Sequence, residues 1–344
     1  MWARRILMNK KLQTIYYLFL LQKRLYTNNP DTIVFGSYAT GNIGDRSIGN
    51  SIEEHLGKAE QCQIASRYNL IPHTENKILG GGGLIHEYRP FKIARDLRIL
   101  NKSKKFAVIG IGVGRVEDPN LIKSIESVLG RAELITVRDS YSKSNLMRIL
   151  GKKVQIYDLA CPSLSLNPTN DDKKMYEYGI SVRSLPNISQ ERFLNANATS
   201  IYPNSLSVEE IQELYEQNLA DIAKKFPEIQ HIPFTREDVS FVKNQTGFQT
   251  MPFDYDPTNV LRKIESVQKM ICMRYHSLAF SILANKPAIA IAYSQKIINL
   301  AESAGIPWYR PHEKIKFEFG LPQYRDKLIN SSKKNFELLQ QALI

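Results

Sequence analysis

The sequence is poor in cysteine, and neither its cysteines nor its histidines are spaced as metal ligands usually are. Its three cysteines, Cys62, Cys161 and Cys272, are odd in number and too far apart for the paired-cysteine knuckle that binds zinc. No His-x-x-x-His pattern replaces them. We therefore expect no metal ion and a protein of the reducing cytoplasm.

Long hydrophobic runs are also lacking. The apolar segment Ile15–Leu21 is far shorter than the roughly 20 residues that a membrane-spanning helix requires. Acidic residues are absent from residues 1–29, which carry a charge of +6, half of the formal net charge of +12. The basic residues of this segment are Arg4, Arg5, Lys10, Lys11, Lys23 and Arg24.

Three interpretations of residues 1–29 stay open. A signal peptide would need small residues at a cleavage site, and Gln22–Tyr26 offers none. Bulky apolar residues among basic ones are typical of a segment that lies on an anionic membrane surface, which is the interpretation that we favour. The third interpretation is a helix packed on the protein's own flank, or a disordered extension.

Composition limits the class of protein. With 43% hydrophobic and 23% charged residues the chain is globular, and at roughly 100–200 residues per domain its 344 residues favour two domains. A pI near 9.4 raises the alternative of a nucleic-acid-binding protein. Half of the charge lies in one terminal segment and no binding module is visible, so we expect no nucleic-acid partner.

Short β-rich runs alternate with helical periodicity, first in residues 30–168 and again in residues 169–320. This alternation predicts an α/β fold of two doubly wound, Rossmann-like domains facing a crevice. Residues 1–29 precede them, residues 321–344 form a C-terminal helix, and a polar linker lies around 167–172. The expected strands are 32–35, 78–79, 106–109, 134–137, 154–157, 179–182, 229–234, 269–273 and 288–292.

Glycine-rich loops follow three expected strands of the first domain. Ligands of such sheets bind at the carboxyl ends of the strands, so Gly41–Asp45, Gly80–Gly83 and Gly110–Gly114 predict an open crevice floor. Gly41–Asp45 is neither a dinucleotide fingerprint nor a P-loop. It is either a cradle for an anion or sugar at a helix N-terminus, or a glycine turn with Asp45 as helix N-cap.

A second motif, Met273–Ser277, ends an expected strand and precedes an apolar helix. It places the Arg274 guanidinium and the His276 imidazole at a helix N-terminus, which suits a phosphate or carboxylate. A histidine here can also be a satisfied helix cap. Arg183, at the end of the first strand of the same domain, strengthens the functional interpretation if it converges on that edge.

The ordered set of motifs resembles the polysaccharide pyruvyl transferase family over about residues 32–305. Its members have a glycosyltransferase-B-like architecture and use phosphoenolpyruvate to build a pyruvate ketal on a sugar. The motifs are Gly41–Asp45, Gly80–Leu84, Gly110–Gly112, Val137–Ser140, Ile180–Arg183 and Arg274–Ser277. Two features depart from the family: Arg46 follows Asp45, and His86–Arg89 is a polar insertion.

The resemblance implies roles for these residues. Arg183, Arg274 and Ser277 would bind the donor, and His276 would protonate the departing phosphate. Asp45 would orient or deprotonate the acceptor hydroxyl. Acceptor binding is expected from Asn42, Gly82, Gly83 and His86.

The expected partners are phosphoenolpyruvate as co-substrate, with no cofactor, and a carbohydrate acceptor that is free or lipid-linked. The product would be a capsule or exopolysaccharide, made in the cytoplasm or at the inner face of the membrane. The alternative function is a nucleotide-sugar-dependent glycosyltransferase on the same twin-domain fold.

Overall fold

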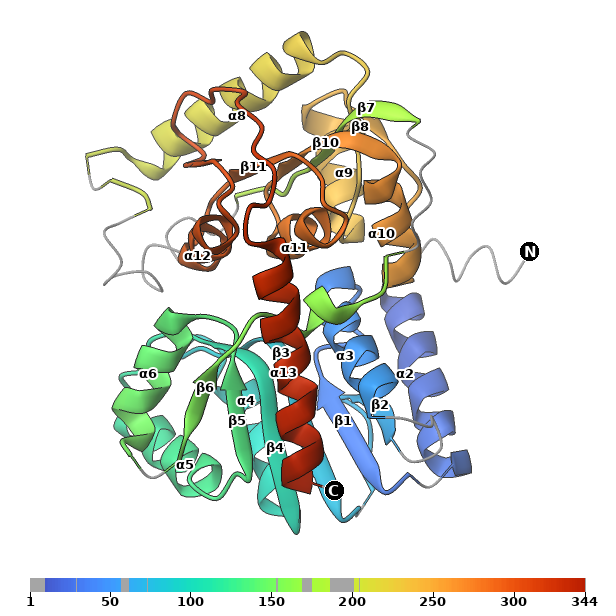
Figure 1. Ribbon diagram of the computed structural model, residues 1–344, viewed down its shortest axis with the longest axis vertical. Coiled ribbons are helices and arrows are strands. Elements are labelled where there is room, and N and C mark those ends of the chain that lie inside the picture. Colours follow the sequence, from blue (N-terminus) through green and yellow to red (C-terminus); the bar gives the residue numbers. More distant parts are fainter. Residues whose placement is uncertain are drawn as a thin grey trace. The chain divides into compact units, whose positions relative to one another are not determined.

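The computed structural model describes residues 10–28, 30–56, 62–72, 74–152, 154–168, 175–185, 201–203 and 205–343. The expected linker around 167–172 and residues 1–9 of the basic segment lie wholly or partly outside these ranges. The chain divides into two compact units (Figure 1). The first contains Met1–Ser165 and Asn330–Ile344, and the second contains Leu166–Ile329.

The first unit holds a parallel sheet with the strand order β2-β1-β3-β4-β5-β6. Its strands are β1 (Thr32–Gly36), β2 (Cys62–Ser66), β3 (Asn76–Ile85), β4 (Lys105–Val113), β5 (Leu134–Val137) and β6 (Ile156–Asp158). Its helices are α2 (Lys10–Asn28), α3 (Ile43–His55), α4 (Pro90–Asn101), α5 (Pro119–Leu129), α6 (Ser140–Leu150), the 3-10 turn η1 (Pro162–Ser165) and the greater part of α13 (Arg325–Leu343).

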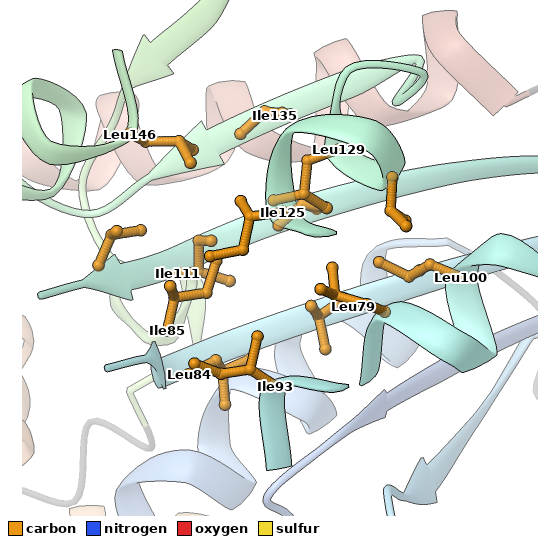
Figure 2. Close-up of a cluster of buried hydrophobic side chains, with 14 of the residues drawn as sticks. Leu79, Leu84, Ile85, Ile93, Leu100, Ile111, Ile125, Leu129, Ile135 and Leu146 are labelled. Atoms are coloured by element: carbon orange, nitrogen blue, oxygen red, sulfur yellow. The ribbon is translucent and has the colours of Figure 1, made fainter. Parts of the chain in front are cut away.

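Apolar faces of the helices cover this sheet (Figure 2). Ile125 and Leu129 recur four residues apart on α5, as the inward face of a helix requires, and both are buried against the sheet. Leu79 and Ile111 come from β3 and β4 below them. Buried strands covered on their faces explain why these segments read as almost continuous apolar runs.

The second unit holds a parallel sheet with the strand order β12-β11-β10-β7-β8-β9. Its strands are β7 (Tyr176–Ser181), β8 (Gln230–His231), β9 (Gln249–Thr250), β10 (Val267–Cys272), β11 (Ala288–Ile291) and β12 (Trp308–Tyr309). Its helices are α8 (Val208–Lys225), α9 (Arg236–Gln245), α10 (Pro257–Glu265), α11 (Tyr275–Leu283), α12 (Gln295–Ala304) and the start of α13.

Local sequence signals set several helix starts in this unit. Ser207 begins α8 and Thr235 begins α9, each by a capping box in which the N-cap hydroxyl and an acidic side chain three residues later satisfy each other's backbone N–H groups. Asp256 caps α10, with Pro257 at its first position.

The predicted α/β class with two doubly wound units is therefore confirmed. Strands β2, β9 and β12 and helix α6 were not predicted. Strands β9 and β12 have two residues each, too short for a recognisable pattern, and β2 contains the buried polar residues Gln63 and Ser66. Helix α13 begins at Arg325, four residues after the start expected from the sequence.

Helix α2 packs on the flank of the first unit. Leu21 and Leu25 are buried, and Arg24 pairs with Glu53 at 2.8 Å. The side chain of Gln22 exchanges hydrogen bonds with the backbone of Leu70, at 2.9 and 2.8 Å. For residues 10–28 the interpretation as a helix packed on the protein's own flank is thus correct. Among the residues that the structure describes, every helix is too short or too polar to span a bilayer.

The end of α13 is anchored in the first unit by Asn335. Its Oδ1 accepts a hydrogen bond from Thr136 Oγ1 at 2.5 Å, and its Nδ2 donates to the carbonyl oxygens of Ala160 and Ser332 at 3.0 and 2.9 Å. Thr136 in turn accepts from the N–H of Gly110 at 2.8 Å. The last segment of the chain thereby completes a buried polar network in the sheet that the first segment builds.

Candidate functional site

Two arginines stand at the carboxyl ends of neighbouring strands in the second unit. Strands β7 and β10 pair with Ser181 opposite Cys272, and the N–H of Met273 donates to the carbonyl of Ser181 at 2.9 Å. Arg183 and Arg274 each lie two residues beyond this pair. The structure therefore brings these two predicted donor residues to one edge of one sheet, as expected from the sequence.

Arg274 is held by an acid that the sequence analysis missed. It is the N-cap residue of α11, and its Nη2 donates to Asp238 Oδ1 and, at 3.1 Å, to Thr235 Oγ1. Asp238 is buried, and its Oδ2 accepts from the N–H groups of Phe234 and Thr235 at 3.1 and 2.9 Å. The guanidinium is thus oriented by contacts within the chain, and its Nε is buried with no hydrogen-bond partner among the described residues.

Arg183 is held by an aromatic ring. Its guanidinium lies 4.3 Å from the centroid of the Tyr293 ring, and its Nε donates to the carbonyl of Ser184 at 3.3 Å. The hydroxyl of Tyr215 donates to the Arg183 carbonyl at 2.7 Å. A cation stacked on an aromatic face keeps its charge while losing conformational freedom, which suits recognition of an anion.

His276 and Ser277 begin α11. His276 is buried, and its ring packs edge-on against Tyr275 with the centroids 5.1 Å apart. Ser277 is fully buried, and its Oγ donates to the carbonyl of Arg274 at 2.7 Å. Its hydroxyl therefore serves the first turn of the helix, whereas the imidazole of His276 follows the oriented Arg274 by two residues.

Further arginines follow other strands of this sheet at the same edge. Arg236 begins α9 just after β8, with its guanidinium 5.3 Å from the Phe253 ring. Arg310 follows β12 directly and pairs with Glu313 at 2.8 Å. Their positions in the sequence could have identified them, because Arg310 directly follows a strand and Arg236 starts the helix that comes after a strand. Together with Arg183 and Arg274 they give the carboxyl edge of this sheet a positive character suited to a polyanionic ligand.

A buried histidine lies beside the Arg274–Asp238 pair. His231 ends β8, and its Nδ1 is 3.2 Å from Thr250 Oγ1. Burial lowers the pKa of His231 to about 4, with Arg274 acting in the same direction and Asp238 against it. His231 is therefore neutral near pH 7 and is not the general acid of this edge.

In the first unit, Asn42 rather than Asp45 caps α3. Asn42 Oδ1 accepts from the N–H of Gly44 at 3.0 Å, and its Nδ2 donates to Asp45 Oδ2 at 3.0 Å. The alternative in which Asp45 is the N-cap is thus wrong, because Asp45 stands in the first turn. Its other oxygen, Oδ1, lies over Gly82, where a Cβ would be 2.8 Å away.

Gly80–Gly83 lie within β3, and Gly110 and Gly112 lie within β4, so the expectation of glycine-rich loops after these two strands is wrong. Nor do these glycines leave the open floor expected from the sequence. A Cβ on Gly83 or Gly114 would lie 2.8 or 2.3 Å from a nitrogen of the His86 ring. A Cβ on Gly112 would lie 2.5 Å from a guanidinium nitrogen of Arg138. Glycine is needed at these positions because the side chains of His86 and Arg138 lie directly against the backbone.

Asp45, His86 and Arg138 therefore surround Gly82 and Gly83. The guanidinium of Arg138 is also 3.7 Å from where a Cβ of Gly83 would stand. Arg138 is buried and immediately follows β5, with its Nε 3.7 Å from Asp139 Oδ2. Arg138 belongs to the Val137–Ser140 motif, for which the sequence indicated no role. A carboxylate, an imidazole and a guanidinium gathered here can orient a hydroxyl group and accept its proton.

The described residues contain no group of three or more His, Cys, Asp or Glu side chains that could hold a metal ion. The side chains described at these two strand edges are fixed guanidinium groups, the buried imidazole of His276 at a helix start, and the Asp45 carboxylate near the His86 imidazole.

Comparison with known proteins finds one matching family and several solved structures of low sequence identity. The model of the polysaccharide pyruvyl transferase family matches residues 13–295. No curated protein matches the chain significantly.

Among solved structures, a UDP-GlcNAc 2-epimerase from Methanocaldococcus jannaschii is 10% identical, with 87% of this chain and 98% of that chain covered and a TM-score of 0.45. The Neisseria meningitidis enzyme is 9% identical, with 90% and 99% covered and a TM-score of 0.46. The wall teichoic acid polymerase TagF is 13% identical, with 95% and 91% covered and a TM-score of 0.41.

Proposed function

Since this chain belongs to the polysaccharide pyruvyl transferase family, we propose that it transfers a pyruvyl group from phosphoenolpyruvate to two hydroxyls of a sugar, forming a ketal and releasing phosphate. Membership of the family indicates a transferase that acts on polysaccharide. The donor, the ketal and the roles of single residues are the proposal.

The observation that carries the proposal is the pairing of Arg183 with Arg274 at adjacent strand ends, next to the start of α11. Phosphoenolpyruvate carries a phosphate and a carboxylate on one small carbon skeleton. Guanidinium groups bind both kinds of anion with two parallel hydrogen bonds, and a helix N-terminus adds N–H donors and positive potential. Two cations and one helix start therefore match the charge of this donor.

The reaction needs two proton donations and two proton removals. Protonation of the methylene carbon C3 makes C2 electrophilic, and a sugar hydroxyl then forms a C–O bond to C2 and loses its proton. The C2–O bond to phosphate breaks as the departing phosphate oxygen gains a proton, and a second hydroxyl takes its place and loses its proton. The two protons gained equal the two protons lost, and no oxidant or reductant is consumed.

We assign two of these four proton transfers to residues. His276, two residues after Arg274, donates the proton to the departing phosphate. Asp45 accepts the proton of an acceptor hydroxyl, and Asn42, Gly82, Gly83 and His86 bind the acceptor around it. Ser277, expected from the sequence to bind the donor, is left out because its hydroxyl already donates to the Arg274 carbonyl.

Thermal unfolding with candidate donors tests the proposal. Phosphoenolpyruvate should raise the melting temperature, because a ligand that binds only the folded state stabilises it by about 2.7 kcal/mol at one hundred times its Kd. UDP- and CMP-sugars should give no shift. A shift with a nucleotide sugar and none with phosphoenolpyruvate would replace the proposal with a nucleotide-sugar-dependent glycosyltransferase.

We further propose that the enzyme works in the cytoplasm, at the inner face of an anionic membrane, on a capsule or exopolysaccharide precursor that is lipid-linked. Helix α2 presents an apolar face to solvent: Ile15, Phe19 and Tyr26 are 60%, 62% and 66% exposed. These residues follow the i, i+4, i+11 spacing of one helix face, and Lys23 is exposed between them. Leu70, bonded to Gln22 of the same helix, is 71% exposed beside them.

The early turns of α2 lie beside the helix that carries Asp45, since the guanidinium of Arg46 is 4.2 Å from the centroid of the Tyr17 ring. Helix α2 ends at Asn28 and β1 begins at Thr32, so the early turns of α2 lie toward the carboxyl edge of the sheet. The bond from Asn69 Nδ2, just beyond β2, to the carbonyl of Leu18 at 2.8 Å agrees with this direction. Together with the +6 charge of residues 1–29, exposed aromatic and aliphatic side chains match the headgroup region of an anionic bilayer.

A further inference from the structure

Ser294 is a buried N-cap serine that caps nothing. It precedes α12 with the extended backbone usual for an N-cap, φ −153° and ψ 152°, yet its side chain makes no cap hydrogen bond. It is 4% exposed, and its Oγ has no hydrogen-bond partner among the described residues. Ser207 and Thr235, in the same unit, both complete capping boxes. A buried hydroxyl without a partner costs stability, so Ser294 is suited to a ligand that supplies one.

The start of α12 also lacks the negative charge that a helix start favours. Its first turn contains no acidic residue and does contain Lys296. A cation at the positive end of the helix dipole is unfavourable unless an anion offsets it. The ammonium of Lys296 lies 5.7 Å from the centroid of the Tyr293 ring, against which the Arg183 guanidinium lies at 4.3 Å. Two cations and a helix N-terminus thus gather around Tyr293 and Ser294.

This place is next to the Arg274 site. Strands β10 and β11 are neighbours, with Cys272 opposite Ala290, and α11 packs against α12. Arg274 lies two residues beyond its strand pair, and Ser294 lies four residues beyond. The two helix starts are therefore neighbours at the carboxyl edge of one sheet, where a ligand with two anionic groups can contact both.

We propose that the start of α12, with Ser294, Lys296 and Arg183, binds the carboxylate of phosphoenolpyruvate, while Arg274 and the start of α11 bind its phosphate. This inference rests on the proposed function and divides the donor between two subsites. The phosphate is assigned to α11 because His276, the proton donor to the leaving group, lies there. Ser294 Oγ donates to the carboxylate, and the carboxylate replaces the missing acid at the helix start.

Two variants of Ser294 test whether the carboxylate and the phosphate of phosphoenolpyruvate bind at separate subsites. Ser294→Ala should raise the KM for phosphoenolpyruvate about tenfold, the effect of losing one hydrogen bond to a charged group, with little change in kcat. Its inhibition by inorganic phosphate should stay as in the wild type. Ser294→Asp should raise the melting temperature without ligand and remove the shift with phosphoenolpyruvate, while the shift with inorganic phosphate is kept.

Ser207→Ala is the matched control, because it removes a working serine cap from the same unit. It should lower the melting temperature and leave the KM unchanged. Equal weakening of phosphate and phosphoenolpyruvate by Ser294→Ala, or an unchanged KM, overturns the assignment of the carboxylate to α12 while leaving the proposed function intact. A wild-type protein that does not respond to phosphoenolpyruvate overturns the proposed function, and the inference with it.

Discussion

Asp238 accepts a charge-assisted hydrogen bond from the guanidinium of Arg274, across 36 residues of sequence, while its second oxygen accepts from the backbone that starts α9. One buried carboxylate thus fixes both a helix start and the direction of the Arg274 guanidinium. Hydrogen bonds between charged groups are about twice as strong as neutral ones. Arg274 is therefore oriented before any ligand arrives, and on our proposal less conformational freedom is lost when the donor binds.

Replacing Asp238 with Asn should release Arg274 without removing it. The KM for phosphoenolpyruvate should rise about tenfold, the equivalent of about 1.4 kcal/mol, with a smaller fall in kcat. Initial rates of phosphate release, with circular dichroism to check folding, would measure both. Thr235→Ser is the control, because it keeps a hydroxyl for Arg274 and for the cap. If Asp238→Asn has wild-type kinetics, the ion pair stabilises α9 and does not position Arg274.

His276→Gln should mainly slow turnover. A proton donor acts as the leaving group develops charge, so kcat at saturating phosphoenolpyruvate should fall about 10²- to 10⁴-fold with little change in KM. Arg183→Lys and Arg274→Lys should show the opposite pattern, because lysine keeps the charge and loses the two-pronged geometry. Near-normal turnover of His276→Gln would make this histidine a structural residue and direct the search for the acid to His86.

The buried His231 makes the second unit sensitive to acid. The unfolded chain binds a proton on this side chain below about pH 6.5, whereas the folded protein binds it only below about pH 4. Stability from this residue is therefore fully present above pH 6.5 and falls as the pH is lowered toward 4. At about 1.4 kcal/mol per pKa unit, the loss reaches about 3 kcal/mol.

Urea unfolding at a series of pH values would measure this loss. Trp2→Phe leaves Trp308 of β12 as the single tryptophan of the chain, so its fluorescence reports on the second unit. The slope of stability against pH between 4 and 6.5 should shrink in a His231→Gln variant of this protein. An unchanged slope would assign the acid sensitivity to other groups.

The apolar face of α2 should control binding to vesicles. Ile15→Ser with Phe19→Ser should weaken co-sedimentation with anionic vesicles at least tenfold, because each bulky side chain contributes apolar surface to the bilayer interface. Leu214→Ser, at an exposed leucine of α8, is the matched control and should bind as the wild type does. Deleting residues 1–29 is a poor test, because it would remove the buried Leu21 and Leu25 from the first unit. Equal binding of all variants would refute membrane docking through α2.

In the second unit, features that depend on a few adjacent residues could be predicted from the sequence. Ser207 and Thr235 start α8 and α9 by capping boxes, and a capping box can be recognised in the sequence because its two residues are three positions apart. Strand β10, Arg274 and helix α11 follow one another closely in the sequence, so the sequence alone predicted their order. Arg183 could be placed beside Arg274 because parallel strands share a carboxyl edge.

Contacts between residues that are far apart in the sequence could not be predicted from it. Asp238 and Arg274 are joined only by folding, and so are Gly112 and Arg138. The glycine runs therefore suggested open space, although they mark positions where a side chain from elsewhere lies against the backbone. The cap of α3 was missed for a different reason. Asn42 and Asp45 are both favoured cap residues, and only the geometry separates the cap from its partner.

The return of α13 to the first unit sets an order of events during synthesis. The second unit is one uninterrupted stretch, Leu166–Ile329, inserted between two segments of the first. Asn335, which completes the hydrogen bonds of Thr136, is synthesised after the whole of the second unit. Domains usually fold from the N-terminus onward as they emerge from the ribosome, but here the second unit has its whole sequence before the first unit does. The sheet of the first unit therefore lacks the partner of Thr136 on β5 until α13 has been made.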